Sequence, residues 1–208
     1  MEAAARGILF VLSAPSGTGK STLVKRLVAE DDRMTFSISY TTRPRREGEL
    51  DGREYHFVDD PTFDRMIERD ELLEWANVFG RRYGTGRAAT RAALASGRDL
   101  LLDVDVQGGR SVRASGEESV SVFVMPPSFS ALEARLRERR TDSEAQIARR
   151  LALAHTETQE ADRYDYVVVN DDLERAAEDL RAIVRAERLR SSRRKAQTQR
   201  IVATFPRT

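Results

Sequence analysis

Short apolar runs alternate with longer amphipathic stretches along most of the chain. The apolar runs favour β-strands, which we expect over residues 7–13, 35–39, 54–58, 72–76, 99–105, 119–125 and 164–169. Apolar positions at helical spacing predict helices over residues 20–30, 61–69, 86–96, 128–139, 143–160 and 172–190. Regular alternation of strands and helices favours an α/β fold.

The predicted strands are of two kinds. Residues 100–102 and 167–169 are apolar without alternation, as expected for strands that are buried on both faces of a parallel sheet. Between residues 36 and 76 the strands are short, alternate with polar residues and have no long helix between neighbours. This middle section therefore predicts a small antiparallel insertion.

Length and composition indicate one globular enzyme-sized domain. The chain has 208 residues, of which 40% are hydrophobic and 33% charged, so a single well-buried domain with appendages is expected. It has no cysteine, which excludes disulfides, a thiolate nucleophile and a cysteine-based zinc site. The N-terminal apolar run ends after five residues, too few for a signal peptide or a membrane span. We expect a cytoplasmic protein with no membrane partner.

The net charge of +1 conceals an asymmetry between the body and the C-terminus. Residues 185–208 contain eight Lys and Arg residues and one acid, Glu187, so residues 1–184 carry a net charge of −6. A basic tail of this kind could bind nucleic acid through phosphate contacts. A solvated helix end that fades into disorder is the more common outcome, so we expect no nucleic-acid partner.

The segment SAPSGTGKST, residues 13–22, follows the first predicted strand and precedes the first predicted helix. It matches the phosphate-binding pattern G-x-x-x-x-G-K-[ST] except that Ala14 occupies the first glycine position. Gly17 and Gly19 stand where close backbone approach and unusual dihedral angles are needed, whereas alanine is acceptable at a strand end if its φ is negative. We therefore predict a phosphate-binding loop, with Lys20 as a positive charge and Ser21 as a hydroxyl ligand for Mg²⁺.

A phosphate-binding loop alone does not separate GTPases, ATPases and small-molecule kinases. The stretch from Asp105 to Gly108 matches the D-x-x-G element of GTPases, but no N-K-x-D string for reading a guanine base is present. A GTPase is therefore disfavoured.

Five further stretches carry a resemblance to a known family. They are SYTTRPRREGELDGREYHF (39–57), LLEWANVFGRRYGT (72–85), LLLDVDVQG (100–108), RLRERRTDSEAQIARRL (135–151) and VVVNDDL (167–173). In order and spacing the chain resembles guanylate kinases, P-loop nucleoside monophosphate kinases that transfer the γ-phosphoryl group of ATP to GMP, from about residue 7 to 188. The resemblance implies a three-layer P-loop NTPase-type fold with a parallel core sheet, a small mixed antiparallel NMP-binding insertion and a helical lid.

The resemblance also divides the chain. It implies one kinase domain whose core comprises residues 5–34, 84–126 and 161–190, with a GMP-binding insertion at 35–83 and a lid region at 127–160. Residues 191–208 are the basic tail. The ATP site would comprise the phosphate loop and one residue beyond it: Ala14, Pro15, Ser16, Gly17, Thr18, Gly19, Lys20, Ser21, Thr22 and Asn170.

The acceptor phosphate needs cationic and hydroxyl donors. Arg43 and Arg46 flank a proline-stiffened turn, and paired guanidinium groups can hold a phosphomonoester, with Tyr55 adding a hydroxyl donor. The resemblance assigns these three residues and Tyr83 to the phosphate of GMP. Without the neighbouring motifs, a solvated arginine-rich loop would be the ordinary interpretation.

Guanine presents two adjacent N–H donors that one carboxylate can accept together. Glu74 is the candidate carboxylate, although a glutamate between Leu73 and Trp75 also fits the polar face of an ordinary strand. The resemblance implies that Glu74 recognises the guanine base and that Ser39 and Thr85 also contact it.

Asp103 and Asp105 lie two residues apart at the end of an apolar strand, on one face. Because ligands bind beyond the carboxyl ends of parallel strands, both should lie near the phosphate loop. One could orient the waters of Mg²⁺ and the other could contact the GMP ribose or an arginine, and the division of these roles stays open. We expect Ser21 and Asp103 to bind the metal, and we expect both Asp103 and Asp105 to belong to the GMP-binding site.

Arg135 and Arg139 lie one helical turn apart, and the resemblance matches them and Arg150 to lid arginines that bridge the phosphates of the two nucleotides. Together with Lys20 and Arg46 they are the expected catalytic residues. For Arg137, Arg140 and Arg149 a solvated helix face is the preferred interpretation. Arg140 stands where the family usually has a glycine, which leaves the local turn and the adenine contact open.

The expected activity is transfer of a phosphoryl group from Mg·ATP to GMP, giving ADP and GDP. A related protein-interaction module would keep the fold and lose the phosphate loop, and a kinase for another monophosphate would need a different base reader than Glu74. The oligomeric state does not follow from the sequence.

Overall fold

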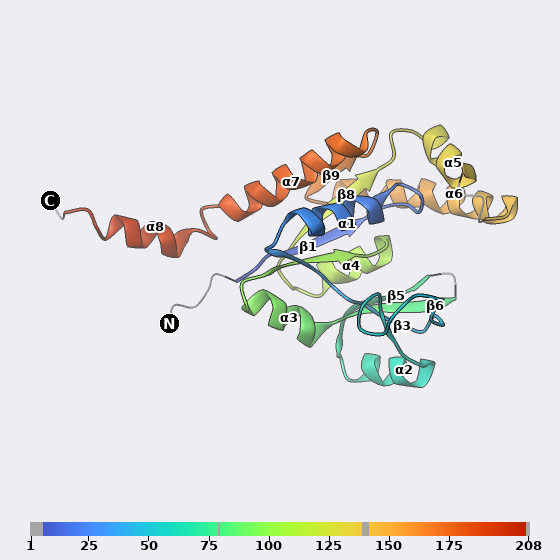
Figure 1. Cartoon of the computed structure of the whole chain (residues 1–208), viewed down its shortest axis with the longest axis horizontal. Helices are drawn as coiled ribbons and strands as arrows, with labels where there is room; N and C mark the ends of the chain where they lie inside the picture. Colours follow the sequence, from blue (N-terminus) through green and yellow to red (C-terminus); the bar gives the residue numbers. More distant parts are fainter. Residues whose placement is uncertain (1–5, 79, 139–141, 207–208) are drawn as a thin grey trace.

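The computed structural model of the chain describes residues 6–78, 80–138 and 142–206. Its centre is a five-stranded sheet in the order β2-β7-β1-β8-β9 (Figure 1). These strands are β1 (Leu9–Ser13), β2 (Met34–Phe36), β7 (Asp99–Asp103), β8 (Ser119–Met125) and β9 (Tyr166–Val169). Each pairing between them is parallel. The predicted α/β class with a parallel core sheet is confirmed.

Helices cover both faces of this sheet. α1 (Lys20–Glu30) and α7 (Leu173–Leu189) pack on one face, and α3 (Arg87–Ala95) and α4 (Val106–Ala114) pack on the other. The central strand serves both layers because alternate side chains point to opposite faces. Phe10 and Leu12 join the cluster under α1 and α7, whereas Leu9 and Val11 join the other.

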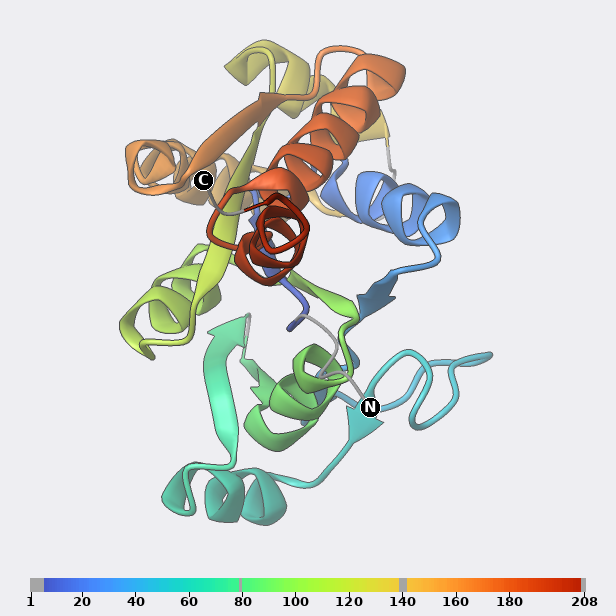
Figure 2. The ribbon, with the colours of Figure 1, turned by 90° about the vertical axis from the view of Figure 1, so that its left-hand side faces the viewer.

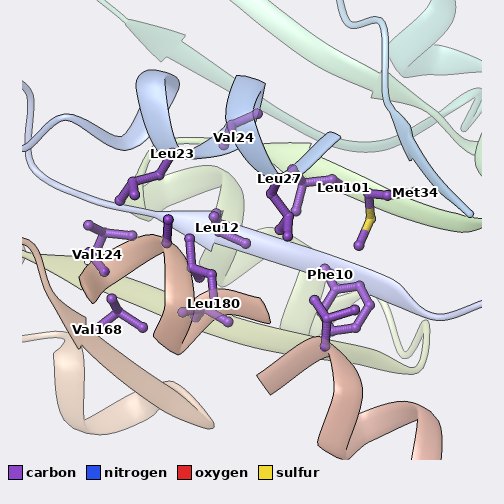
Figure 3. Close-up of a cluster of buried hydrophobic side chains, with 14 of the residues drawn as sticks. Phe10, Leu12, Leu23, Val24, Leu27, Met34, Leu101, Val124, Val168 and Leu180 are labelled. Carbon is purple, nitrogen blue, oxygen red and sulfur yellow. The ribbon is translucent and has the colours of Figure 1, made fainter. Parts of the chain in front are cut away.

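Figure 3 shows the larger cluster, in which Leu23 and Leu27 of α1 and Leu180 of α7 converge on Leu12 of β1. All four side chains are almost completely removed from solvent. Burial of each leucine contributes about 1.5–3 kcal/mol of transfer free energy. This packing fixes the carboxyl end of β1, where the phosphate loop begins.

A second sheet lies below the first in Figure 1, in the order β4-β3-β6-β5. Its strands are β3 (Tyr40–Thr41), β4 (His56–Phe57), β5 (Leu72–Val78) and β6 (Arg81–Gly86). β3 pairs parallel with β4 and antiparallel with β6, which also pairs antiparallel with β5. α2 (Asp60–Glu68) closes it through Phe63 and Met66, which pack on Leu72. The small mixed sheet of the predicted fold is therefore present.

Two further helices follow β8. α5 (Phe129–Glu138) and α6 (Glu144–Thr158) share a buried cluster of their own, in which Leu132 and Leu136 meet Ile147 and Leu151. Ser143 begins α6 with a reciprocal cap, because its hydroxyl accepts from the backbone N–H of Gln146 while the Gln146 side chain accepts from the Ser143 N–H. A short 3-10 turn, η1 (Ala161–Arg163), leads from α6 to β9.

The structure differs from the predicted elements at three places in the middle of the chain. β2 pairs with β7 and so belongs to the core sheet, although the insertion was expected to begin at residue 35. β6 was not predicted as a strand, and it crosses the expected boundary between residues 83 and 84. α4 was not predicted either, because two consecutive glycines break the helical pattern of its sequence.

The glycines of α4 are explained by close packing. A Cβ atom at Gly108 would lie 2.7 Å from a carboxylate oxygen of Glu74, and one at Gly109 would lie 2.6 Å from the Tyr164 hydroxyl. Asp105 begins the helix, since its side chain accepts from the Gly108 N–H at 2.8 Å. The loss in helix propensity therefore allows α4 to approach β5 and Tyr164 closely.

The basic tail forms a helix rather than only a fading end. α8 (Lys195–Val202) has no buried residue and extends away from the rest of the chain, at the red end of Figures 1 and 2. Among the helices of the described ranges, none has the length and apolar character needed to cross a membrane.

Candidate active site

The phosphate loop connects β1 to α1 through two residues with left-handed backbone conformations. Gly17 has φ +94° and Gly19 φ +93°, and Cβ atoms there would lie 2.7 Å from Leu136 and 2.5 Å from the Asn170 amide. Glycine is therefore required at both positions. Ala14 is buried at the end of β1 and is not among the non-glycine residues with positive φ. The missing first glycine does not disturb the loop.

A cavity of about 680 Å³ opens beside this loop, between the core and the second sheet. Sixteen residues expected in the site line it: Ala14, Pro15, Ser16, Gly17, Thr18, Gly19, Lys20, Ser21, Thr22, Ser39, Tyr55, Glu74, Tyr83, Asp103, Asp105 and Arg150. An adjoining cavity of about 380 Å³ is lined by Arg43 and Arg46 and shares Tyr83 and Arg150 with the first. The residues expected for the two nucleotides thus gather around two neighbouring cavities.

Lys20 and Ser21 meet the end of β7. The Lys20 ammonium group forms an ion pair with Asp103 and donates to the Val104 carbonyl. The Ser21 hydroxyl donates to the other oxygen of Asp103 at 3.4 Å. One carboxylate therefore contacts both side chains that the phosphate-binding pattern contributes.

Two predicted residues hold the back of the loop. Asn170, buried after β9, donates from its amide to the Thr18 carbonyl oxygen at 2.7 Å. Arg135 donates to the same oxygen at 3.3 Å and to the Asn170 carbonyl at 2.9 Å. Neither side chain lines the two cavities. Arg139 and Arg140 lie outside the described residues.

The first acceptor arginine is held in place by an acid that the sequence interpretation did not select. Arg43 forms an ion pair with Glu49 at 2.7 Å, and its guanidinium lies over the ring of Tyr55 at 5.3 Å from the centroid. Glu49 also accepts from the backbone N–H of Arg46 at 2.8 Å. These contacts hold the pKa of Glu49 below its usual range and stiffen the turn between the two arginines.

The tyrosines form one wall of the larger cavity. The rings of Tyr55 and Tyr83 meet edge to face with centroids 5.8 Å apart. Burial raises the pKa of Tyr55, so its hydroxyl keeps its proton and remains a donor. The cation of Arg150 enters from α6 and contacts the Ser16 hydroxyl, which links the loop to the adjoining cavity.

Glu74 on β5 is a buried carboxylate that faces the cavity. Its side chain is 5% exposed and accepts from the Thr85 hydroxyl at 2.6 Å. Burial, with a smaller contribution from the charge of Asp105, raises the pKa of Glu74 to about 7. Thr85 does not line the cavity, so it contacts Glu74 from behind.

The cavity also contains functional candidates that were missed. Gln107, Arg149 and Glu157 line it, and Arg149 lines the adjoining cavity as well. Arg149 had been interpreted as part of a solvated face. The helical spacing of Arg150 and Glu157, seven residues apart, would have placed both on one face of α6.

The site fits a magnesium ion in the presence of nucleotide phosphates. In the described part of the chain, no cluster of three or more His, Asp or Glu side chains could hold a metal ion by itself. Mg²⁺ in phosphoryl-transfer sites commonly uses one or two protein oxygens and completes its shell with phosphate and water. The Ser21 hydroxyl and the Asp103 carboxylate, 3.4 Å apart, supply oxygen ligands of this kind.

A strand, a glycine-containing loop with the phosphate-binding sequence and a helix, facing a second sheet with its own cationic cavity, are typical of a P-loop nucleoside monophosphate kinase. The family model described as "Guanylate kinase" matches residues 6–187. The chain therefore belongs to the guanylate kinase family, and the match ends before the basic tail.

Individual relatives agree with this family. The chain is 53% identical over 189 residues to a guanylate kinase of Rhodopseudomonas palustris, covering 90% of this chain and 86% of the relative. It is 50% identical over 192 residues to one of Zymomonas mobilis, covering 91% and 88%. The crystal structure of guanylate kinase from Anaplasma phagocytophilum superposes with a TM-score of 0.74 at 34% identity, covering 91% of this chain and 90% of that one.

Proposed function

We propose that this chain transfers the γ-phosphoryl group of ATP to GMP and that the larger cavity holds the reacting groups of both nucleotides. The observation that carries the proposal is the composition of that cavity. An intact phosphate loop lies at one end, and the buried carboxylate of Glu74 lies on the opposing sheet. Membership of the guanylate kinase family supports the same reaction.

On the donor side, the backbone N–H groups of the loop and the N-terminus of α1 would bind the β- and γ-phosphates of ATP. Lys20 adds its charge to the same phosphates, and Arg150 reaches the loop at Ser16. Asn170 and Arg135 act as positioning residues in this proposal, because their donors are directed at the carbonyl oxygens of the loop and of Asn170 itself. Arg139, outside the described residues, is proposed as a further lid arginine.

On the acceptor side, Arg43, Arg46, Tyr55 and Tyr83 would hold the phosphate of GMP. The base would then reach Glu74, whose ionised carboxylate can accept from the N1–H and the 2-amino group of guanine together. Ser39 also lines the cavity and is proposed as a further base contact. Adenine lacks the adjacent pair of donors, so this geometry favours GMP over AMP.

In the proposed reaction, a phosphate oxygen of GMP attacks the γ-phosphorus in line with the departing oxygen of ADP. The new P–O bond forms GDP as the bond to the β-phosphate oxygen breaks. Positively charged side chains stabilise the charge on the transferred group, and positioning supplies the rest. Lys20, Arg46 and Arg150 line the two cavities and are the described cations for this role.

A magnesium ion bound to Ser21, Asp103 and the ATP phosphates would neutralise part of the phosphate charge. The ion pair of Lys20 with Asp103 brings the ammonium group to the same place. Asp105 accepts the N–H of Gly108 and so shapes the turn into α4 beside Glu74. We therefore propose that Asp103 binds the metal and that Asp105 belongs to the site of the acceptor nucleotide.

The proposed division of the chain follows the two sheets. The acceptor-binding insertion comprises β3 to β6 and therefore ends at Gly86, three residues later than the sequence pattern suggested. α5 and α6, within residues 127–160, form the lid. ATP and GMP are both metabolites of the cytoplasm, where we place the reaction.

The test is a coupled assay of ADP release with ATP, Mg²⁺ and each of GMP, AMP, CMP and UMP in turn. GMP should support turnover at least a hundredfold more efficiently than AMP. No ADP release with GMP, or equal efficiency with AMP, would remove the proposal. Direct detection of GDP separates transfer to GMP from hydrolysis of ATP.

A further inference from the structure

One face of α6 points into the active-site cavity. Arg150, Leu153 and Glu157 all line it, and their spacing of three and seven residues places them on a single helical stripe. Arg150 stands at the end toward the phosphate loop, where it contacts Ser16. Glu157 lies two turns further along, at the end of the stripe away from the adjoining arginine-lined cavity.

Glu157 is the carboxylate of this cavity that has no partner. Among the described residues it forms no hydrogen bond or ion pair through its side chain, although that side chain is half-buried. The three other carboxylates are engaged: Glu74 with the Thr85 hydroxyl, Asp103 with Lys20 and Asp105 with the Gly108 N–H. The Glu157 side chain lines the cavity without a donor from the described residues, so its oxygens are available to accept hydrogen bonds from a ligand there.

The electrostatic surroundings of Glu157 include Asp105 and Lys20. Burial and, to a smaller extent, the charge of Asp105 raise its pKa to about 7, while Lys20 opposes the shift. Asp105 begins α4, whose Gly108 lies against the carboxylate of Glu74. Glu157 therefore faces the stretch of cavity between the base reader and the phosphate loop.

The group that must occupy this stretch is a sugar. In the proposed function the base of GMP lies at Glu74 and its phosphate at Arg43 and Arg46, so the ribose lies between them. A ribose carries two vicinal hydroxyl donors, and a carboxylate has two oxygens to accept them. Asp105, the other candidate for this contact, already accepts the Gly108 N–H.

We propose that Glu157 accepts hydrogen bonds from the ribose hydroxyls of the acceptor nucleotide and thereby selects GMP over dGMP. The inference rests on the proposed function and deepens it. A site that hydrogen-bonds a substrate hydroxyl rejects the analogue without it, because the buried acceptor is then left unsatisfied. One hydrogen bond to a charged group corresponds to about a tenfold to hundredfold preference.

The experiment compares kcat/KM for GMP and dGMP in the native chain, Glu157→Gln and Glu157→Ala, with saturating Mg·ATP at pH 8. Glu157→Ala should lower kcat/KM for GMP about tenfold more than it lowers kcat/KM for dGMP, because dGMP keeps the 3′-hydroxyl and lacks only the bond from the 2′-hydroxyl. Glu157→Gln keeps one acceptor oxygen, so its kcat/KM for GMP should lie between that of the native chain and that of Glu157→Ala. Glu178→Gln, which removes an exposed carboxylate of α7, is the matched control and should change neither substrate.

Several outcomes would overturn the inference. Equal losses for GMP and dGMP would mean that Glu157 only supports the structure, and unchanged selectivity would mean that it does not contact the sugar. A change in the preference for ATP over dATP would assign Glu157 to the donor instead. Failure of the native chain to phosphorylate GMP would contradict the proposed function itself, and this outcome is distinct from a failure of the ribose contact.

Thermal melting of each variant checks folding. Glu157→Gln should melt at or above the native temperature because an unpartnered carboxylate is lost.

Discussion

The side-chain amide of Asn170 donates to the carbonyl oxygen of Thr18 at 2.7 Å and so ties the end of the last core strand to the middle of the phosphate loop. The two residues are 152 positions apart in the sequence. Arg135 joins them by donating to the carbonyl oxygens of both. The loop is thus braced by polar contacts from β9 and α5 on the side away from the cavity.

This brace gives the first prediction. Asn170→Ala should raise KM for ATP about tenfold, because the Thr18 carbonyl loses its shorter hydrogen bond and the loop loses its fixed shape. The measurement is the initial rate as a function of ATP at saturating GMP. Asp171→Ala removes the neighbouring exposed acid and should leave KM for ATP unchanged. The same KM in Asn170→Ala would show that the loop holds its conformation alone.

The second prediction concerns Lys20. Lys20→Met should lower kcat at least a hundredfold, since a cation is removed from the phosphates of the transition state and Asp103 loses its ion pair. Steady-state kinetics with both substrates saturating measures the effect. Lys25→Met changes an exposed lysine of the same helix and should retain native turnover. A loss of less than about fivefold in Lys20→Met would contradict the assignment.

The third prediction follows from the raised pKa of Glu74. Burial raises this pKa from 4.5 to about 7, so the folded chain retains a proton that the unfolded chain releases. The native chain therefore loses stability relative to Glu74→Gln, which does not titrate, as the pH rises from 5 to 8. The free energy of unfolding of the native chain, measured relative to that of Glu74→Gln, should fall by up to about 3 kcal/mol over this range.

Denaturant unfolding without nucleotide, at half-unit pH intervals, measures this gap between the two free energies of unfolding. Glu178→Gln, at an exposed glutamate on α7, is the control for loss of a carboxylate at the surface. A constant gap for Glu74→Gln would mean that the carboxylate of Glu74 is ionised across the whole range.

The fourth prediction separates backbone strain from crowding in the loop. Gly19→Ala meets a positive φ of +93° and the Asn170 amide at 2.5 Å, whereas Gly116→Ala meets a positive φ of +74° and nothing within 4 Å. Gly116→Ala should cost about 1 kcal/mol from its backbone alone. Gly19→Ala should cost more and should abolish ATP binding measured by calorimetry, because Asn170 must move. Equal costs would show that the Asn170 contact relaxes freely.

The fifth prediction concerns a buried ion pair at the end of α7. Arg188 contacts Asp99, whose side chain is 0% exposed, at 2.6 Å and Asp31 at 2.7 Å. Arg188→Ala leaves the buried Asp99 without its cationic partner, which should destabilise the fold by about 3–5 kcal/mol. Arg181→Ala breaks a surface pair with Glu30 and should cost less than about 1 kcal/mol. Denaturant unfolding compares the two, and equal costs would contradict the prediction.

The parts of the site that the sequence predicted are those whose signal is local. The phosphate loop is specified by Gly17, Gly19 and Lys20 within a few residues, and the apolar run before it specifies a buried strand. The uninterrupted apolar runs of β7 and β9 likewise predict the parallel sheet. Ala14 could be accepted in advance because only a positive φ would exclude it.

The parts of the fold and site that the sequence did not predict depend on contacts between distant segments. α4 contains two consecutive glycines, which in the sequence indicate a break between elements. The structure shows that they allow close contact with Glu74 and Tyr164. β6 lacks the apolar pattern of a strand, and its Arg81 and Tyr83 side chains line the acceptor cavity. Glu157 lies on a helix with an ordinary amphipathic pattern, and only the structure shows that its side chain lines the cavity without a partner.

The tail has a practical consequence. In the described part of the chain the last buried side chain is Glu187, and α8 contributes none. Truncation after Arg194 would therefore leave the hydrophobic interior and the catalytic cleft intact, whereas truncation before Glu187 would remove the helical end that anchors Asp99. Fusion partners, purification handles and surface-immobilisation tags can accordingly be joined beyond Arg194 without obstructing nucleotide entry.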